Sequence, residues 1–404
     1  MILRETIPRD RTQGIAVGLV ALILLALTLM HFVTLNGHTE GVRRVISGRL
    51  GVPVDIAELR YVLLPYPRLT LQGVALGASQ EIKIGAIAVN ANPLTLLADS
   101  MTLDEVEVTG LVANEGALAM MSRFAEAPSD NRVLVVRRIR LRESRLGLRD
   151  IVTPVLDGDI TIGEDGSVEH AVLISSATRA ELRRKDRTWH AAISGRSWQA
   201  PLGPALTFDE LSVAAVFEPD RVTLTSIDGR IGRGILKGTA RATWNDGMRA
   251  DGEFSLTGAE LAPLLAAFTR DFTATGAVSV KGTFVLQGAS LSALFAAPKV
   301  DAMFSVERGE LNNVDLLRLL QSSSRGGKTR FDTLGGALQV SDGQLSFRKL
   351  QLGSAALSAE GEVNVAPNGD LSGRINTDVG TKTVVVARTD LNVRGTVKSP
   401  LLAP

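Results

Sequence analysis

One long apolar segment, residues 14–33, stands near the amino terminus of the chain. At 1.5 Å per residue, a helix of about twenty residues matches the hydrocarbon core of a bilayer, which is about 30 Å thick. No charged residue interrupts the segment, and His31 lies at its far end. Residues 34–38 lack the small-x-small pattern of a signal-peptide cleavage site. We therefore predict an uncleaved single-span anchor at 14–33, behind a cytoplasmic tail at 1–13.

The orientation of this anchor follows from length and not from charge. Arginines stand on both sides of the apolar segment, so the positive-inside rule does not choose between the two orientations. A short tail and a very long downstream region favour an amino terminus in the cytoplasm, with the bulk of the chain translocated. A cleaved signal peptide and a buried core helix are the alternatives.

The composition argues against several classes of function. The 404 residues carry a net charge of +1, so no global field attracts nucleic acid or an anionic surface. Aromatic residues make up only 4% of the chain, fewer than base-stacking surfaces need. The absence of cysteine excludes a disulfide framework and a thiolate metal site. Apolar residues nevertheless make up 45%, so the chain has much aliphatic surface to cover.

From about residue 132 the sequence predicts an almost unbroken series of β-strands. Stretches of alternating apolar and polar residues are separated by dipeptides typical of tight turns. These dipeptides are Asp165-Gly166, Asp228-Gly229, Asp246-Gly247, Asp342-Gly343 and Asn368-Gly369. Short helical patterns occur at 41–50, 259–268, 291–296 and 314–320. Because strands so outnumber helices, a βαβ architecture is disfavoured.

Two of the turns also predict which residues pair across the hairpins. A two-residue loop after Ser341 sets Val340 opposite Leu345, and a three-residue loop ending at Gly369 sets Val365 opposite Leu371. The apolar residues that these turns and the strand alternation place on a sheet face are Val278, Val280, Phe284, Leu286, Leu338, Val340, Leu345, Phe347, Val365 and Leu371. A sheet with one apolar face must cover it by curling, by packing against a second sheet, or by binding a ligand.

No motif in the chain predicts catalysis, a cofactor or a metal. The four histidines are not at helical ligand spacing, and neither a Gly-x-Ser-x-Gly elbow nor a Walker loop is present. The glycine-rich string at 229–234 is followed by a strand pattern, so tight turns explain it better than a phosphate site does. We predict a protein that is not an enzyme.

Two basic clusters have two interpretations each. In the first, at 136–142, Arg138, Arg140 and Arg142 alternate with apolar residues; the second, at 183–187, lies in a stretch that reads as a loop. Solvated charges on a strand face discourage edge pairing, and this interpretation is the favoured one. The alternative is contact with lipid phosphates, which suit guanidinium geometry.

Both ends of the chain resemble a known family. The stretch 52–77 (VPVDIAELRYVLLPYPRLTLQGVALG), followed by IKIGAIAVNANPLTLLADSMTLDEVEVTG, resembles the amino-terminal signature of the AsmA family. The stretches DAMFSVERGELNNVDLLRLLQ, TRFDTLGGALQVSDGQLSFRKLQL and DLNVRGTVKSPL resemble its carboxyl-terminal region. The resemblance covers about 40% of the chain, in the right order behind an apolar segment. The chain departs from well-known members by being shorter, and its middle section is unmatched.

The resemblance implies a bacterial inner-membrane protein with its bulk in the periplasm. The family is similar to bridge-like lipid-transfer proteins, so the implied fold is mainly β: an elongated, curled, antiparallel-rich sheet that forms an open apolar groove, with few short helices. β-sandwich-like periplasmic domains are the alternative fold. The implied function is to bind, shield or transfer phospholipid for outer-membrane lipid homeostasis, and the ten apolar residues above would face the lipid. The alternative function is that of a scaffold or assembly factor for outer-membrane proteins.

These expectations divide the chain into five parts. They are the tail at 1–13, the anchor at 14–33, an AsmA-like amino-terminal region at 36–130, a β-rich middle region at 131–275, and an AsmA-like carboxyl-terminal region at 276–404. We also expect an unpaired last strand near 391–397, where a periplasmic protein, an outer-membrane protein or a second copy could add a strand.

Overall fold

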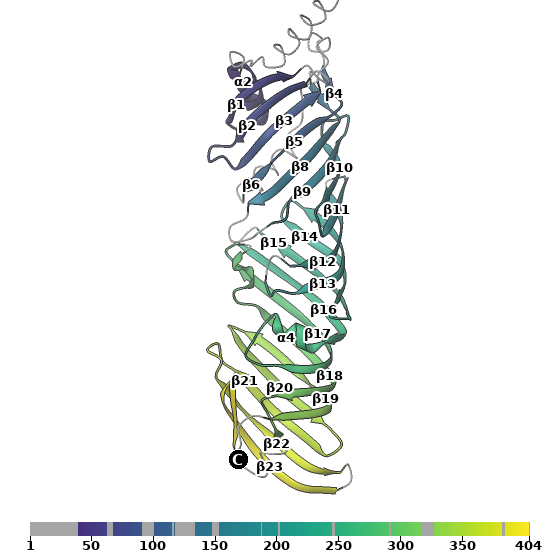
Figure 1. The fold of residues 1–404 in the computed structure, drawn as a ribbon, viewed down its shortest axis with the longest axis vertical. Coiled ribbons are helices and arrows are strands. Elements are labelled where there is room, and N and C mark those ends of the chain that lie inside the picture. The colour runs from purple at the N-terminus through teal and green to yellow at the C-terminus, as the bar shows by residue number, and fades with distance from the viewer. Residues whose placement is uncertain are drawn as a thin grey trace, which may run out of the picture. The chain divides into compact units, whose positions relative to one another are not determined.

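The computed structural model describes residues 39–62, 68–90, 101–114, 117, 134–147, 153–186, 188–200, 203–244, 247–290, 292–316, 327–381 and 384–403. The chain forms two compact units: unit 1 comprises residues 1–149 and 153–175, and unit 2 comprises residues 150–152 and 176–404. Each unit is mainly β-sheet (Figure 1). The predicted anchor at 14–33 lies outside the described residues. Within the described ranges no helix has both the length and the apolar character that a membrane span requires.

Unit 1 consists of a helix and a sheet of mixed connectivity. Its elements are α2 (Thr39–Leu50), β1 (Val54–Val62), β2 (Arg68–Leu76), β3 (Ile82–Asn90), β4 (Met101–Leu103), β5 (Val106–Thr109), β6 (Val112–Asn114), β7 (Leu134–Val136), β8 (Arg138–Gly147), β9 (Leu156–Ile162) and β10 (Val168–Ile174). β1, β2 and β3 pair antiparallel in chain order, and β5 and β6 each join β3 to β8. β8, β9 and β10 continue antiparallel, while β4 and β7 form a separate parallel pair.

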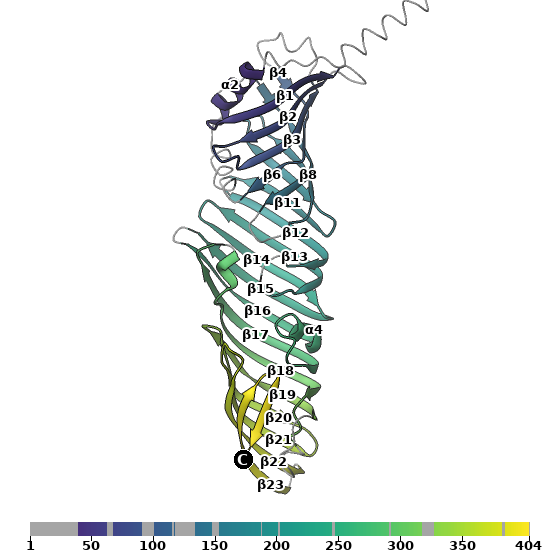
Figure 2. The ribbon, with the colours of Figure 1, turned by 60° about the vertical axis from the view of Figure 1, so that its left-hand side comes forward.

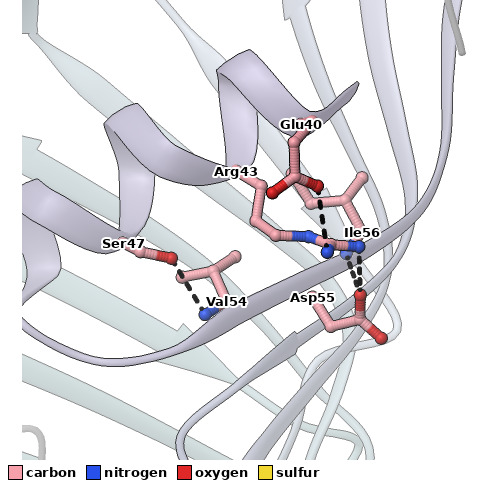
Figure 3. A network of polar contacts seen from close by, with 6 residues as sticks. All are labelled: Glu40, Arg43, Ser47, Val54, Asp55 and Ile56. Carbon is pink, nitrogen blue, oxygen red and sulfur yellow. Dashed lines mark hydrogen bonds and ion pairs between the residues drawn. The ribbon is translucent and has the colours of Figure 1, made fainter. Parts of the chain in front are cut away.

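The helix predicted at 41–50 is confirmed as α2, which is attached to the first strand by polar contacts (Figure 3). Arg43 bridges Glu40 at 3.1 Å and Asp55 at 2.7 Å, and the Val54 N–H donates to Ser47 Oγ at 3.1 Å. Gly51 ends the helix with φ +65°, a conformation that costs a residue without Cβ little. The apolar residues of β1–β3 are deeply buried below this helix, with Leu59 only 2% exposed.

Unit 2 is a single antiparallel meander, and its strands are seen from two sides in Figures 1 and 2. Its strands are β11 (Thr178–Lys185), β12 (Thr188–Gln199), β13 (Thr207–Glu218), β14 (Arg221–Ile231), β15 (Gly234–Thr243), β16 (Met248–Glu260), β17 (Ala274–Gly288), β18 (Lys299–Asn312), β19 (Lys328–Ser341), β20 (Gln344–Gly353), β21 (Leu357–Val365), β22 (Leu371–Thr381), β23 (Val384–Thr396) and β24 (Ser399–Ala403). Each pairs antiparallel with the next in the chain. The helix α4 (Leu261–Ala266) and the 3-10 helix η3 (Ser292–Phe295) replace two of the hairpin turns and fall within the helical stretches predicted at 259–268 and 291–296.

The predicted hairpin registers are confirmed. Val340 pairs with Leu345 and Val365 pairs with Leu371. Asp342 and Gly343 have φ +52° and +75°, as a two-residue turn with two left-handed positions requires. The predicted turn at Asp228-Gly229 is wrong, because both residues lie inside β14. Ile227 and Ile231 lie two residues to either side of Gly229, so the period-two pattern continues through the dipeptide and dominates over the turn propensity of Asp-Gly.

β-Bulges interrupt several pairings of unit 2. The register shifts between Leu256 and Ala259, between Thr275 and Ala277, and between Phe347 and Leu350. Each bulge adds local twist and bends its strand. The strands of this sheet are therefore coiled, as Figure 2 shows for unit 2.

Candidate functional site

One face of the unit 2 sheet is apolar across many successive strands. The cross-strand partners Phe284, Val300, Val340, Leu345, Val365 and Leu371 form one row from β17 to β22. All six side chains are half-buried. The next row on this face contains Ala302, Leu338, Phe347 and Val363. Because the side-chain period of a strand is two, these rows lie on the same side of the sheet.

The apolar rows continue through the earlier strands of the same unit. Leu182, Ala191, Ala215, Leu224 and Ala240 are successive partners from β11 to β15. A parallel row contains Ala180, Ile193, Val213, Ile227 and Gly238. We call this side of β11–β23 the apolar face.

The opposite side of the sheet is polar. The row directly beside the first apolar row consists of Thr283, Asp301, Gln339, Ser346, Asn364 and Ser372. Most of these side chains are exposed. The contrast between adjacent rows shows that the sheet has one polar face and one apolar face.

The registers place all ten sequence-predicted apolar residues on the apolar face. Val278 and Val280 lie opposite Val306 and Phe304 of β18, and Leu286 lies opposite Ala250 of β16. The sequence analysis missed the apolar residues of β18, which lies between β17 and β19. The signal was present, because Val300, Ala302, Phe304 and Val306 alternate strictly along that strand. The apolar rows of β11–β15 were missed as well.

The apolar face has a closed strip and an accessible strip. Val278 (4% exposed), Val306 and Leu352 belong to a buried cluster. Leu261 and Leu264 of α4 pack against that cluster. The row from Phe284 to Leu371 lies nearer the opposite ends of the strands and is only half-buried. Among the described residues, protein therefore covers the closed strip, whereas the accessible strip is only half-buried. Its first residue, Phe284, packs against the cluster of Leu286 and Leu294 at η3.

Phenylalanines on this face lie opposite glycines. Phe254 pairs with Gly238 and Gly282, and Phe304 pairs with Gly336. The Phe304 and Phe347 rings meet edge to face, with their centroids 6.1 Å apart. Glycine lets neighbouring strands of a twisted sheet approach closely, and the large ring opposite covers the space that its missing side chain leaves.

The first basic cluster is occupied by ion pairs within unit 1. Arg138 donates from Nε to Asp159 Oδ1 at 2.7 Å, and Arg140 contacts Glu105 at 3.0 Å. Arg142 contacts Asp157 at 3.4 Å. Asp157 and Asp159 stand on β9, and Glu105 directly precedes β5, so this cluster stabilises its own sheet.

The Arg138–Asp159 pair makes unit 1 sensitive to acid. The hydrogen bond from Arg138 holds the pKa of Asp159 below its ordinary value. A carboxyl with a lowered folded-state pKa contributes stability above the unfolded-state pKa, about 4, and loses it as pH falls through the lower folded value. We expect Asp159→Asn to reduce the hydrogen-exchange protection of β8 at pH 7 by at most about 1 kcal/mol, because the pair is partly exposed.

The same comparison at a pH below the lowered folded-state pKa of Asp159 is the check on this prediction. There the wild-type carboxyl becomes protonated, and the difference between the two proteins should shrink toward zero. A difference that persists unchanged at low pH would show that the asparagine perturbs packing and that the charge is irrelevant.

The second basic cluster lies at a hairpin and not in a loop, which corrects the sequence-based prediction. Arg183, Arg184 and Lys185 end β11, and Asp186 forms the turn with φ +56°. Arg183 contacts Glu181 at 2.6 Å. Arg187 lies outside the described residues.

The carboxyl-terminal edge also differs from the prediction. The segment 391–397 is not an unpaired last strand, because Asn392–Thr396 of β23 pairs with β24. Leu391 is only 1% exposed and belongs to the buried cluster. The part of β23 before it, from Val384 to Asp390, has no strand on its outer side among the described residues, and Val386 is 78% exposed.

The described residues offer little support for a metal site or a phosphate-binding loop. They contain no group of three or more His, Asp or Glu side chains that could hold a metal ion. Gly232 and Arg233 form the two-residue turn between β14 and β15, with φ +50° and +67°, so the glycine-rich string at 229–234 has a structural role. No family model, curated protein or solved structure matches this chain.

Proposed function

We propose that this chain binds phospholipid acyl chains on the apolar face of unit 2, and that it shields or transfers phospholipid for outer-membrane lipid homeostasis. The observation that supports this most is the half-buried apolar row from Phe284 to Leu371. Each buried methylene group contributes about 0.8 kcal/mol, so a lipid leaves a bilayer only where hydrocarbon contact is replaced along its whole length. A continuous row of apolar side chains offers such contact, and an open groove is the shape that suits it.

A dry β-sandwich is less consistent with the strand pairings. Among the described residues, the strands of unit 2 all belong to one sheet, and the separate two-stranded sheet of β4 and β7 belongs to unit 1. In unit 2, α4 and η3 cover parts of the apolar face. Beyond Phe284, which packs against the cluster at η3, the accessible strip is half-buried, and acyl chains would complete its cover.

The location belongs to the same proposal. The apolar segment 14–33 would anchor the chain in the bacterial inner membrane, with units 1 and 2 in the periplasm. The resemblance of both ends to the AsmA family supports this location and the lipid substrate. No catalytic step is part of the proposed function.

A scaffold for outer-membrane protein assembly is the second candidate, and one observation favours it. The outer edge of β23 has no proline from Val384 to Asp390, and its first four residues, 384–387, carry no charge that would block strand addition. An extended segment of a periplasmic partner could pair there.

Lipid stoichiometry separates the two candidates. We expect the full chain, purified in detergent, to retain at least one phospholipid more than residues 1–38 fused to an unrelated carrier and purified in the same way. Extracted phospholipid would be quantified per protein by mass spectrometry. Equal lipid content in the two proteins would contradict the lipid-binding proposal and favour the scaffold.

A further inference from the structure

The apolar face of β11 ends at a charged residue. Ala180, Leu182 and Arg184 are successive residues on this side of the strand. Arg184 pairs across the hairpin with Trp189, which in turn pairs with Phe217 of β13. Arg184 therefore lies one position beyond Leu182 on the apolar face and stands level with Trp189 and Phe217.

Aromatic residues with a polar atom border the face at the same strand ends. Trp244 follows β15 in the turn to β16, and its Nε1 donates to the carbonyl oxygen of Pro219, in the β13–β14 turn, at 3.2 Å. Trp189 is half-buried, and Trp244 is exposed. Tryptophan suits a boundary between hydrocarbon and water, because its ring is apolar and its N–H is polar.

Arg184 is exposed and available for an anion. Its Nε donates to the Asp186 carbonyl oxygen at 3.3 Å, and within the described ranges no carboxylate contacts its guanidinium. The arginines of the first basic cluster differ in this respect, because Arg138, Arg140 and Arg142 each contact a carboxylate. They also differ in place, since they alternate with apolar residues on their strand, whereas Arg184 continues an apolar row.

We infer that Arg184 binds the phosphate of an anionic phospholipid whose acyl chains lie along Leu182 and Trp189 on the apolar face. This inference rests on the proposed lipid-binding function and adds the position of the headgroup. A guanidinium forms two parallel hydrogen bonds to a phosphate, and the adjoining hydrocarbon accounts for the chains. The combination selects an amphiphile with a negative headgroup.

The test compares two probes that differ only in the headgroup. Phosphatidylglycerol and diacylglycerol with the same acyl chains are titrated into the full-length protein in detergent micelles, and binding is read by native mass spectrometry. We expect Arg184→Gln to weaken phosphatidylglycerol binding by about tenfold and to leave diacylglycerol binding unchanged. Arg184→Lys keeps the positive charge but not the two parallel N–H donors of the guanidinium, so it should lose less affinity for phosphatidylglycerol than Arg184→Gln does.

The matched control is Arg179→Gln, on the same strand but on the polar face opposite Ser194. It should change neither affinity. Unchanged phosphatidylglycerol binding in Arg184→Gln, or an equal loss of both lipids, would overturn the headgroup site while leaving the lipid-binding function intact. Failure of the wild-type chain to bind either lipid would overturn the function itself, and the headgroup site with it.

Discussion

Aspartate at Val278 should destabilise unit 2 by about 3–5 kcal/mol, whereas aspartate at Val340 should leave it folded and remove its lipid. The two residues lie on the same face of the same sheet but differ in cover. Val278 is 4% exposed within the buried cluster, so its carboxylate would have neither water nor a partner. Val340 is half-buried between Val300 and Leu345, where water can reach the charge but acyl chains would be repelled.

Tryptophan fluorescence during urea unfolding gives the stability part of this comparison. The three tryptophans, Trp189, Trp198 and Trp244, all belong to unit 2, so the signal reports that unit alone. Phospholipid content is measured on the same preparations. If the wild-type protein carries no lipid and Val340→Asp costs as much stability as Val278→Asp, unit 2 is a dry fold and the lipid-binding account fails.

Gly361→Ala should cost unit 2 about 3 kcal/mol, although it adds one methyl group. A Cβ at Gly361 would stand 2.2 Å from the Arg374 carbonyl oxygen and 2.8 Å from the Ile375 Cα on the adjacent strand. Both atoms belong to backbone, which cannot move aside as a side chain would. The close approach of β21 and β22 on the apolar side therefore requires glycine here.

Gly335→Ala is the control for this prediction. Its Cβ would stand 3.3 Å from the Phe304 carbonyl oxygen, so a smaller loss is expected. Urea unfolding followed by tryptophan fluorescence measures both variants. Equal stability of Gly361→Ala and the wild-type protein would show that β21 and β22 separate easily, and that their close packing does not shape the sheet.

Local patterns in the sequence predicted a large part of this fold. A turn with two left-handed residues fixes the register of its whole hairpin, so Asp342-Gly343 sufficed to pair Val340 with Leu345. Period-two alternation then placed Val278 and Phe284 on the apolar face. Helix α2 was predictable because Gly51 and Pro53 mark its end.

Tertiary contacts decided what the sequence left open. Val278 and Val340 look alike in sequence, although one is buried and the other is half-buried. The difference arises from α4 and the cluster packed over one strip. The last strand was misassigned because β24 is short and contains Pro400, which makes it a poor strand by composition. The headgroup candidate Arg184 was hidden in a basic cluster that reads as a loop, and only the register with Trp189 places it at the end of an apolar row.

Site-specific photo-cross-linking in living cells tests the central claim most directly. A photoreactive phenylalanine analogue replaces Leu345 on the apolar face or, in the matched control, the adjacent Ser346 on the polar face, in cells whose phospholipid carries radioactive phosphate. Lipid around the predicted anchor would label both positions alike, so the label at position 346 measures that background. We predict labelled phospholipid on the protein from position 345 and not from position 346. No label at either position, or equal label at both, would contradict lipid binding on the apolar face.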